Sequence, residues 1–298
     1  MRGRALLQVD DLAKTYGGTV ALDGVTFAVQ PGEMFGFVGA NGAGKTTCMR
    51  IIMGILTPDR GRVTWQGRQL TYQDRRSFGY MPEERGLYQK MKVAEQIEYF
   101  GRLYGMSARD ARRGADEWIE RLGLGERRND EVQALSLGNQ QRAQLAVALI
   151  HDPPVLVLDE PFSGLDPLAV DELAGALAEK RAAGVPIIFS SHQLDLVERI
   201  SDSVGIISSG TMVAVGPISE LRAQGRRLLR VSVRHASPGW RDNLPGTVVS
   251  TPADDVALID PNGMKDQDVL RAALASGEVA HFGWEEPTLT DRFREAVA

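Results

Sequence analysis

The stretch that decides the fold is Gly39-Ala40-Asn41-Gly42-Ala43-Gly44-Lys45-Thr46, which fits the pattern G-x-x-x-x-G-K-[ST]. It follows the apolar run 34–38, which has the composition of a strand buried on both faces. It precedes residues 46–56, a segment of helical character that ends before Pro58. A strand, a glycine-rich loop and a helix in this order predict a phosphate-binding loop.

This loop carries the chemistry that a polyphosphate requires. Glycines let backbone N–H groups approach the phosphate closely, and the N-terminus of the following helix adds partial positive charge. Lys45 supplies a full charge for the β- and γ-phosphates, and the Thr46 hydroxyl can ligate Mg²⁺. The nucleotide-binding residues expected here are Gly39, Asn41, Gly42, Ala43, Gly44, Lys45, Thr46 and Thr47.

A second element of the site is Val155-Leu156-Val157-Leu158-Asp159-Glu160, a hydrophobic strand that ends in two carboxylates. In a parallel α/β sheet, ligands gather at the carboxyl ends of the strands, where the phosphate loop also lies. Adjacent residues of a strand point to opposite sides, so the two acids are expected to have different roles. Asp159 is suited to hold Mg²⁺ through water. Glu160 is suited to polarise the attacking water as a general base.

Strands and helices alternate through most of the chain. Strands are expected at 155–158, 186–190 and 204–207, with helices at about 168–182 and 193–200 between them. The alternation predicts a mainly parallel sheet covered on both faces, with antiparallel strands near the N-terminus. Helical spacing at about 94–150 indicates an inserted helical lobe. The fold class is therefore α/β, of the P-loop NTPase type with a RecA-like sheet.

A composition break after Leu221 indicates a second domain. Residues 222–230 are basic, and turn signals follow at 237–239 and 261–263. Strands are expected at 231–233, 248–250 and 256–259, and helices at 268–275 and 289–297. We therefore expect a nucleotide-binding domain over 1–222 and a small α+β domain over 223–298.

The composition is that of an ordinary globular protein. The chain has 298 residues, of which 43% are hydrophobic, and its net charge of −5 argues against a general nucleic-acid binder. The single cysteine, Cys48, fits a reducing compartment and is expected to pack rather than react. No apolar stretch reaches the ~18–20 residues that cross a bilayer, and no signal-peptide core is visible at the N-terminus. These features predict a cytoplasmic protein with no nucleic-acid partner.

Further segments make the chain resemble the ATP-binding subunit of an ABC transporter. Residues 135–142, LSLGNQQR, look like that family's signature, usually LSGGQ followed by QR. Leu137 and Asn139 depart from it, and Asn139 is kept among the expected nucleotide-binding residues. Ser136 and Gly138 are retained, and the resemblance implies that they approach the γ-phosphate of ATP.

The same resemblance assigns roles to single residues elsewhere in the chain. Asp166, in the segment 163–166, looks like the last residue of the family's D-loop at the dimer junction. His192 is placed like the switch histidine that contacts the γ-phosphate. Tyr16 looks like the aromatic residue that stacks on adenine, and Val20 is expected to pack beside it.

Glu83 stands where the family's Q-loop has glutamine, after Gly79-Tyr80-Met81-Pro82. A carboxylate there can still approach Mg²⁺ or the water near it. Residues 79–88, GYMPEERGLY, resemble a bacterial subgroup of ABC-2-type exporters that includes sodium-extrusion ATPases. That subgroup also has a small C-terminal domain, often ending in a motif like residues 286–293, EPTLTDRF. The segment 83–93, with Arg85, Tyr88 and Met91, is where the family's ATPase meets its membrane subunit.

The resemblance implies ATP hydrolysis in a composite site between two nucleotide-binding domains paired head to tail. The partners would be a second copy or a paralogue, together with separate transmembrane permease subunits at the cytoplasmic face of the membrane. ATP and Mg²⁺ are the implied ligands. Two alternatives stay open: a soluble ABC ATPase that is not coupled to transport, and a regulatory module that binds ATP with little turnover.

Overall fold

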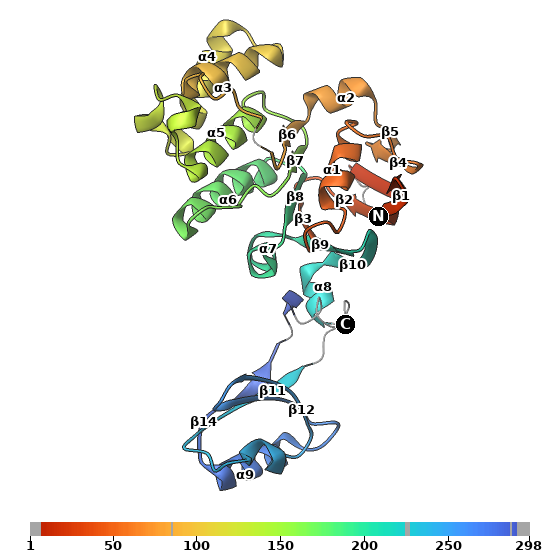
Figure 1. Ribbon diagram of the computed structural model, residues 1–298, viewed down its shortest axis with the longest axis vertical. Coiled ribbons are helices and arrows are strands. Elements are labelled where there is room, and N and C mark those ends of the chain that lie inside the picture. Colours follow the sequence, from red (N-terminus) through yellow and green to blue (C-terminus); the bar gives the residue numbers. More distant parts are fainter. Residues whose placement is uncertain (1–6, 85, 224–226, 287, 291–298) are drawn as a thin grey trace. The chain divides into compact units, whose positions relative to one another are not determined.

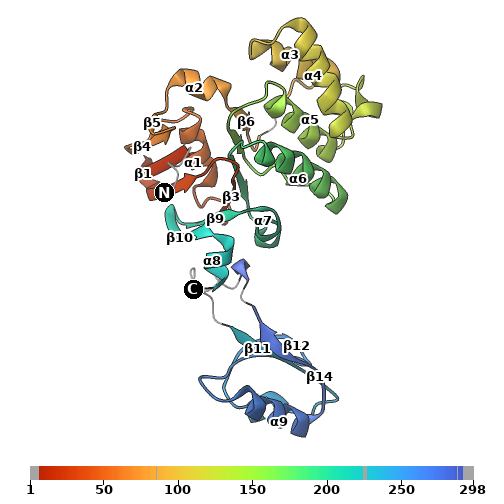
Figure 2. The same cartoon turned by 180° about the vertical axis from the view of Figure 1, so that it is seen from behind.

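A six-stranded sheet forms the centre of the nucleotide-binding part, with the strand order β10-β9-β3-β8-β7-β6 (Figure 1, Figure 2). The computed structural model describes residues 7–84, 86–223, 227–286 and 288–290. All strands of this sheet run parallel except β10, which pairs antiparallel with β9, so the predicted mainly parallel sheet is confirmed. The strands are β3 (Met34–Val38), β6 (Gly79–Met81), β7 (Leu156–Leu158), β8 (Ile187–Ser191), β9 (Ser203–Ser208) and β10 (Thr211–Pro217).

A second, antiparallel sheet has the order β2-β1-β4-β5 and confirms the antiparallel strands expected near the N-terminus. Its strands are β1 (Leu7–Tyr16), β2 (Thr19–Val29), β4 (Arg60–Trp65) and β5 (Arg68–Gln69). Buried residues of this sheet share one core with helix α1 (Lys45–Ile52) and with β3 of the parallel sheet. The helix that follows the phosphate loop is therefore anchored along its length. Within it, burial raises the pKa of the Cys48 thiol far above its usual range, so this thiol stays protonated and packs.

The helical lobe lies between β6 and β7 in the chain, as predicted, and its helices run from gold to yellow-green in Figure 1. Ser107 caps its second helix by accepting a hydrogen bond from the Asp110 N–H group at 3.1 Å. The face that carries Trp118, Ile119 and Leu122 is buried. The lobe contains α3 (Val93–Leu103), α4 (Ala108–Arg121), the 3₁₀ turns η1 (Gly125–Arg127) and η2 (Val132–Ala134), and α5 (Leu137–Leu149).

Besides α1, the described residues of this part have three helices outside the lobe, α2 (Tyr72–Ser77), α6 (Pro167–Ala182) and α7 (Leu194–Ile200), and α8 (Ile218–Ala223) follows at its C-terminal end. The sequence predicts α6 and α7 within a residue of these bounds, but it predicts neither α2 nor α8. Helix α2 is too short to show helical periodicity and buries none of its residues. Its one local signal is the capping box between Thr71 and Asp74.

The C-terminal part is a separate α+β unit, and the two compact units divide between Ile218 and Ser219. Its antiparallel sheet has the order β12-β13-β11-β14, and a core around Leu229, Val231 and Ile259 joins the sheet to helix α9. The elements are β11 (Leu228–Arg234), η3 (Trp240–Asn243), β12 (Thr247–Ala253), β13 (Val256–Asp260), α9 (Asp266–Ser276) and β14 (Glu278–Glu285). Strand β14 is not predicted from sequence, because none of its residues is fully buried and exposed residues do not alternate regularly along it. The helix expected over 289–297 lies almost wholly outside the described residues.

Deleting residues 223–298 is expected to leave a folded chain that still binds ATP. The phosphate loop, the acidic pair and the core between the two sheets all precede the deletion. Circular dichroism and titration with a fluorescent ATP analogue would check this against the full-length protein. An insoluble product, or one that no longer binds the analogue, would show that the first unit depends on the second.

His151 is expected to make the protein less stable in mild acid. Its ring stacks on Tyr104 at 3.6 Å between centroids, and its Nε2 atom lies 3.2 Å from the Ser77 carbonyl oxygen. Burial lowers the pKa of His151 to about 4, below the value near 6.5 of an unfolded histidine. Between these two values the unfolded chain binds the extra proton, so stability falls as the pH falls from about 6.5 toward 4.

Denaturant unfolding at pH 7.5 and pH 5 measures this effect in wild type and in His151→Phe, which keeps an aromatic ring on Tyr104. We expect His151 to account for roughly 1–2 kcal/mol of the decrease in the free energy of unfolding between pH 7.5 and pH 5. The variant should lose correspondingly less stability between the two pH values. An equal loss in both proteins would contradict the assignment.

Candidate functional site

The site forms where parallel strands end side by side. Strand β3 leads into the phosphate loop, β8 into His192, β7 into Asp159 and Glu160, and β6 into Glu83. Since β3, β8, β7 and β6 are neighbours in the sheet, segments far apart in the chain meet at one edge. The predicted convergence of the phosphate loop and the acidic pair is therefore present in the fold.

The phosphate loop has the backbone that its glycines allow. Gly42 and Gly44 have φ angles of 80° and 112°, which residues with side chains rarely adopt. A Cβ atom on Gly39 would lie 2.4 Å from the Ile207 carbonyl oxygen, and one on Gly44 would lie 2.5 Å from the Ala21 carbonyl oxygen. Gly44 is also the N-cap of α1 and provides no side-chain cap. The first N–H groups of α1 are thus left for an anion.

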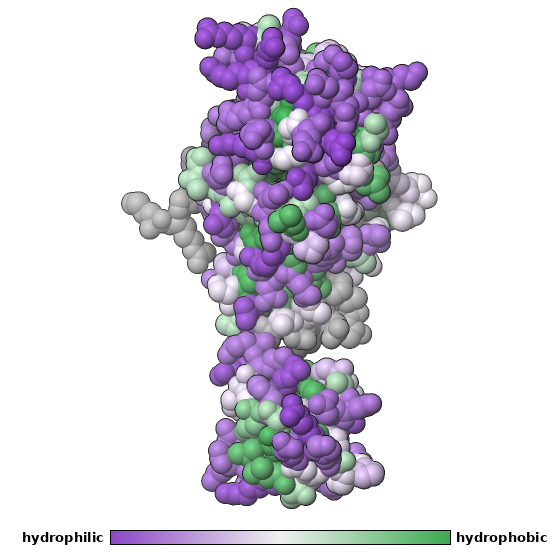
Figure 3. Space-filling model, turned by 90° about the vertical axis from the view of Figure 1, so that its left-hand side faces the viewer, coloured by the Kyte–Doolittle hydropathy of each residue, from purple (hydrophilic) through white to green (hydrophobic). Residues whose placement is uncertain are grey.

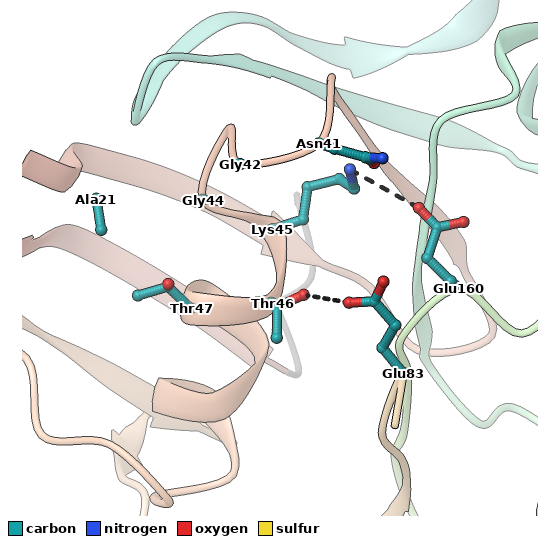
Figure 4. Close-up of a pocket in the computed structure, with 9 residues that line it drawn as sticks. All are labelled: Ala21, Asn41, Gly42, Gly44, Lys45, Thr46, Thr47, Glu83 and Glu160. Carbon is teal, nitrogen blue, oxygen red and sulfur yellow. Dashed lines mark hydrogen bonds and ion pairs between the residues drawn. The ribbon is translucent and has the colours of Figure 1, made fainter. Parts of the chain in front are cut away.

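A pocket of about 270 Å³ opens in front of this loop. It is lined by Ala21, Asn41, Gly42, Gly44, Lys45, Thr46, Thr47, Glu83 and Glu160 (Figure 4). All of these residues except Ala21 were expected from the sequence. In Figure 4 Lys45 points toward Glu160 and Thr46 points toward Glu83. Each of these two residues therefore faces a carboxylate that follows another strand.

Lys45 is almost fully buried at the base of this pocket, with 6% of its surface exposed. Its ammonium group donates to the Gly39 and Ala40 carbonyl oxygens at 2.7 and 3.2 Å. The Nζ atom also lies 3.7 Å from Oε1 of Glu160. An ammonium group has three donor hydrogens, so the two contacts to the loop leave one for a phosphate oxygen.

The acidic pair has a geometry that differs from simple strand alternation. Strand β7 ends at Leu158, and Glu160 has a left-handed backbone with a φ angle of 51°. Asp159 is completely buried; Ser190 Oγ donates to its Oδ1 atom at 2.6 Å, and its Oδ2 atom has no hydrogen-bond partner. Burial and then the Asp159 charge raise the pKa of Tyr80, which keeps that phenol neutral. The two carboxylates diverge because of a turn, and not because both are strand residues.

His192 joins the site through Glu160. Its Nδ1 atom lies 3.1 Å from Oε2 of Glu160, while about half of the His192 side chain remains exposed. Glu160 therefore has Lys45 on one carboxylate oxygen and His192 on the other. Residues separated by more than a hundred positions in the sequence thus form one charged cluster.

Thr46, Glu83 and Asp159 offer oxygen atoms of the kind that bind a hard divalent cation. The Thr46 hydroxyl lies 3.4 Å from a carboxylate oxygen of Glu83, and the unpartnered Oδ2 atom of buried Asp159 offers another acceptor. Oxygen ligands are those that Mg²⁺ prefers. Within the part of the chain that the structure describes, no three His, Cys, Asp or Glu side chains form a metal cluster. A magnesium ion here would need phosphate oxygens and water to complete its ligands.

The two residues expected to contact adenine lie at the tip of the β1–β2 hairpin. Tyr16 and Val20 are exposed, at 44% and 53%, and neither lines the pocket. Lys14 Nζ stands 5.7 Å from the centre of the Tyr16 ring. Ala21, the next residue of the hairpin, does line the pocket. Sequence reasoning missed Ala21, and only its place next to Val20 could have indicated it.

The signature segment is not part of this pocket. Helix α5 begins at Leu137, because Ser136 acts as its N-cap. The Ser136 hydroxyl accepts a hydrogen bond from the Asn139 N–H group at 3.3 Å, and Ser136 itself is exposed. Gly138 and Asn139 lie in the first turn of α5. Their backbone N–H groups form a second, separate helix N-terminus.

Asp166 neither lines the pocket nor belongs to helix α5, which carries the signature segment. It caps α6 by accepting a hydrogen bond from the Ala169 N–H group at 2.9 Å, and it is exposed. Leu165, beside it, would touch a Cβ atom on Gly138 at 3.4 Å. The predicted D-loop segment therefore lies next to the signature segment. Arg85, the remaining residue expected at the surface for the membrane subunit, lies outside the described residues.

Comparison with known proteins identifies the family. Residues 22–163 match the family model described as ABC transporter, and residues 216–297 match one described as ATP-binding protein DrrA1-3-like, C-terminal domain. The chain is 38% identical over 296 residues to the uncharacterized ABC transporter ATP-binding protein YhaQ of Bacillus subtilis, and the match covers 98% of each protein.

Two further similarities agree with this match. The chain is 35% identical over 219 residues to Nod factor export ATP-binding protein I of Ralstonia nicotianae, which covers 72% of this chain and 68% of that protein. A solved structure of the ATP-binding subunit of an ABC transporter is 35% identical, with a TM-score of 0.67, over 74% of this chain and 92% of that one. The chain therefore belongs to the ATP-binding subunits of ABC transporters, which bind ATP and hydrolyse it to power transport.

Proposed function

We propose that each ATP is bound between the phosphate loop of one chain and the signature segment of a second chain, either another copy or a paralogue. One solved structural neighbour of the chain is a dimeric bacterial ABC transporter cassette, and another is part of an ABC transporter complex. The observation that carries the proposal is that one chain contains only half of such a site. Lys45, Thr46 and Glu160 line the pocket, whereas Ser136 and the N-terminus of α5 are exposed outside it.

In this proposal the phosphate loop positions the triphosphate. The backbone N–H groups at Asn41–Thr47 and the Lys45 ammonium bind the β- and γ-phosphates. Thr46, Glu83 and Asp159 hold Mg²⁺, Asp159 through water, and the buried unpartnered oxygen of Asp159 supports this assignment. When bound, the ion neutralises charge on the phosphate oxygens. Tyr16 and Val20 contact the adenine ring at the edge of the pocket.

Glu160 is proposed as the general base. It accepts a proton from the water that attacks the γ-phosphorus, while the bond from that phosphorus to the ADP oxygen breaks. His192 orients the Glu160 carboxylate through their 3.1 Å contact and approaches the γ-phosphate. Ser136, Gly138 and Asn139 of the second chain complete the charge stabilisation with the N-terminus of their α5 helix. Asp166 lies at the junction of the two chains.

The surface at 83–93 is proposed to receive a transmembrane permease subunit at the cytoplasmic face of the membrane. Tyr88 is 53% exposed and groups with Tyr99 and Phe100 at ring distances of 5.9 and 6.1 Å. Such an exposed aromatic group supports a protein contact. None of the helices in the described residues is long and apolar enough to cross a membrane. On the face drawn in Figure 3, hydrophobic residues occur in small separate groups among hydrophilic ones.

Export is the proposed direction of transport. The similarity to a protein named for Nod factor export and the DrrA-like C-terminal match support export over import. The sequence also resembles sodium-extrusion ATPases, so sodium ions are one of the candidate cargoes. Reconstitution with the companion membrane protein, followed by ATP-dependent extrusion of candidate solutes from cells or vesicles, would decide the cargo.

Mixing two inactive variants tests the composite site. Lys45→Ala disables the phosphate loop and Ser136→Arg disables the signature, so neither homodimer has an intact site. In a self-associating protein, a 1:1 mixture should regain about a quarter of the wild-type sites, because random heterodimers each rebuild one site. Phosphate release and light scattering in ATP are the measurements. Efficient hydrolysis by a chain that stays monomeric in ATP would contradict the composite site.

A further inference from the structure

The peptide that carries the general base is held in a strained conformation. Glu160 has a φ angle of 51°, in the left-handed region that residues with side chains rarely occupy. On its N-terminal side, the Glu160 N–H group donates to Ser190 Oγ at 2.8 Å. Within the turn, the Ser163 N–H group donates to the Glu160 carbonyl oxygen at 3.1 Å. Such a conformation persists only where its surroundings fix it.

Helix α5 provides a further restraint from the helical lobe. Gln141 is buried, with 5% of its surface exposed, and its Nε2 atom donates to the carbonyl oxygens of Glu160 and Pro161 at 2.9 and 3.0 Å. One turn later, Gln144 Nε2 donates to the Pro82 carbonyl oxygen at 2.7 Å, next to Glu83. The helix whose N-terminus carries the signature thus also binds the backbone beside both glutamates of the pocket.

We propose that Gln141 is a positioning residue for ATP hydrolysis. It holds the Glu160–Pro161 peptides so that the Glu160 carboxylate stays between Lys45 and His192. The inference rests on the proposed role of Glu160 as general base. It also gives α5 a mechanical role: a displacement of its N-terminus by nucleotide in the second chain moves the peptide that carries Glu160.

Loss of the Gln141 amide should lower turnover more than ATP binding. Without it, two buried carbonyl groups lose a donor, and the left-handed peptide can relax. A displacement of the carboxylate by about 1 Å is enough to cost roughly 100-fold in rate, whereas Gln141 does not line the pocket in front of the phosphate loop. In full-length Gln141→Met we expect kcat to fall about 10- to 100-fold with the ATP dissociation constant unchanged within about twofold.

Arg75→Met is the matched control. Arg75, half-buried on α2, likewise donates to two backbone carbonyl oxygens, those of Ile52 and Leu70, at 2.9 and 3.3 Å. Neither partner lines the pocket or belongs to the signature segment. This variant should lose a comparable amount of thermal stability while its kcat stays close to that of wild type. Equal losses of kcat in the two variants would overturn the positioning role.

A double-mutant cycle on turnover gives a second test, whose result does not depend on a change in stability alone. If Gln141 acts through Glu160, Gln141→Met should have little further effect on the residual turnover of Glu160→Gln. An additive effect in that background would overturn the inference. Gln141→Asn, which keeps the amide but shortens the side chain, provides the same test if the methionine variant does not fold. Normal kcat in the Gln141 variants, with Glu160→Gln inactive, would refute the inference but leave the proposed function intact.

Discussion

Replacing Glu160 by Gln is expected to lower ATP turnover about 100- to 10,000-fold while leaving ATP binding intact. The amide keeps the shape of the side chain but cannot accept the proton of the attacking water. It also removes a negative charge that lies 3.7 Å from the Lys45 ammonium and beside the triphosphate. The bound nucleotide should therefore persist, and the ATP-bound dimer should accumulate.

Phosphate release and size-exclusion chromatography with light scattering, each in ATP and Mg²⁺, measure these two effects. Glu117→Gln is a suitable control, because this exposed carboxylate lies on α4 outside the pocket. It should leave both turnover and association unchanged. Wild-type turnover in Glu160→Gln would remove Glu160 from the role of general base.

Replacing Lys45 by Ala is expected to weaken ATP binding at least about 100-fold, because a buried positive charge beside the β- and γ-phosphates is lost. The loss is larger than that of a surface lysine, since the pocket also contains the Glu83 and Glu160 carboxylates. Without Lys45, these negative charges face the triphosphate with less compensation. Removal of the ammonium also leaves the Gly39 and Ala40 carbonyl groups without their donor.

Titration with a fluorescent ATP analogue measures this loss, and circular dichroism verifies that the variant is folded. Lys265→Ala, at an exposed lysine of the C-terminal unit, changes the net charge equally and should bind like wild type. Lys45→Arg keeps the positive charge but changes the shape of the side chain, because a guanidinium group is too broad for the carbonyl contacts of the loop. Unchanged affinity in Lys45→Ala would contradict the phosphate site.

Local features of the sequence predicted much of this fold. Strand β3 begins and ends where the pattern placed it, because a short apolar run that ends at a glycine leaves little choice. The missed helices α2 and α8 and strand β5 are short, and the missed strands β10 and β14 bury none of their residues fully, so their hydrophobic patterns carry little information.

The details of the site were harder to predict from the sequence. Strand alternation suggested that Asp159 and Glu160 would diverge, but the divergence comes from the left-handed conformation of Glu160. That conformation depends on Ser190 and Gln141, which belong to other elements. Ala21 lines the pocket only because the β1–β2 hairpin packs near Gly44. None of these contacts has a signature in local periodicity.

The sequence by itself determined that this chain has a phosphate-binding loop, an acidic strand end and a signature segment, since each depends on a few adjacent residues. Tertiary structure decided which of them meet. The order of β3, β8, β7 and β6 brings Lys45, His192 and Glu160 within 4 Å contacts, and leaves Ser136 outside their pocket. The physical reason is that spacing along the chain fixes local backbone conformation, whereas strand order and helix packing result from the burial of a core shared by distant segments.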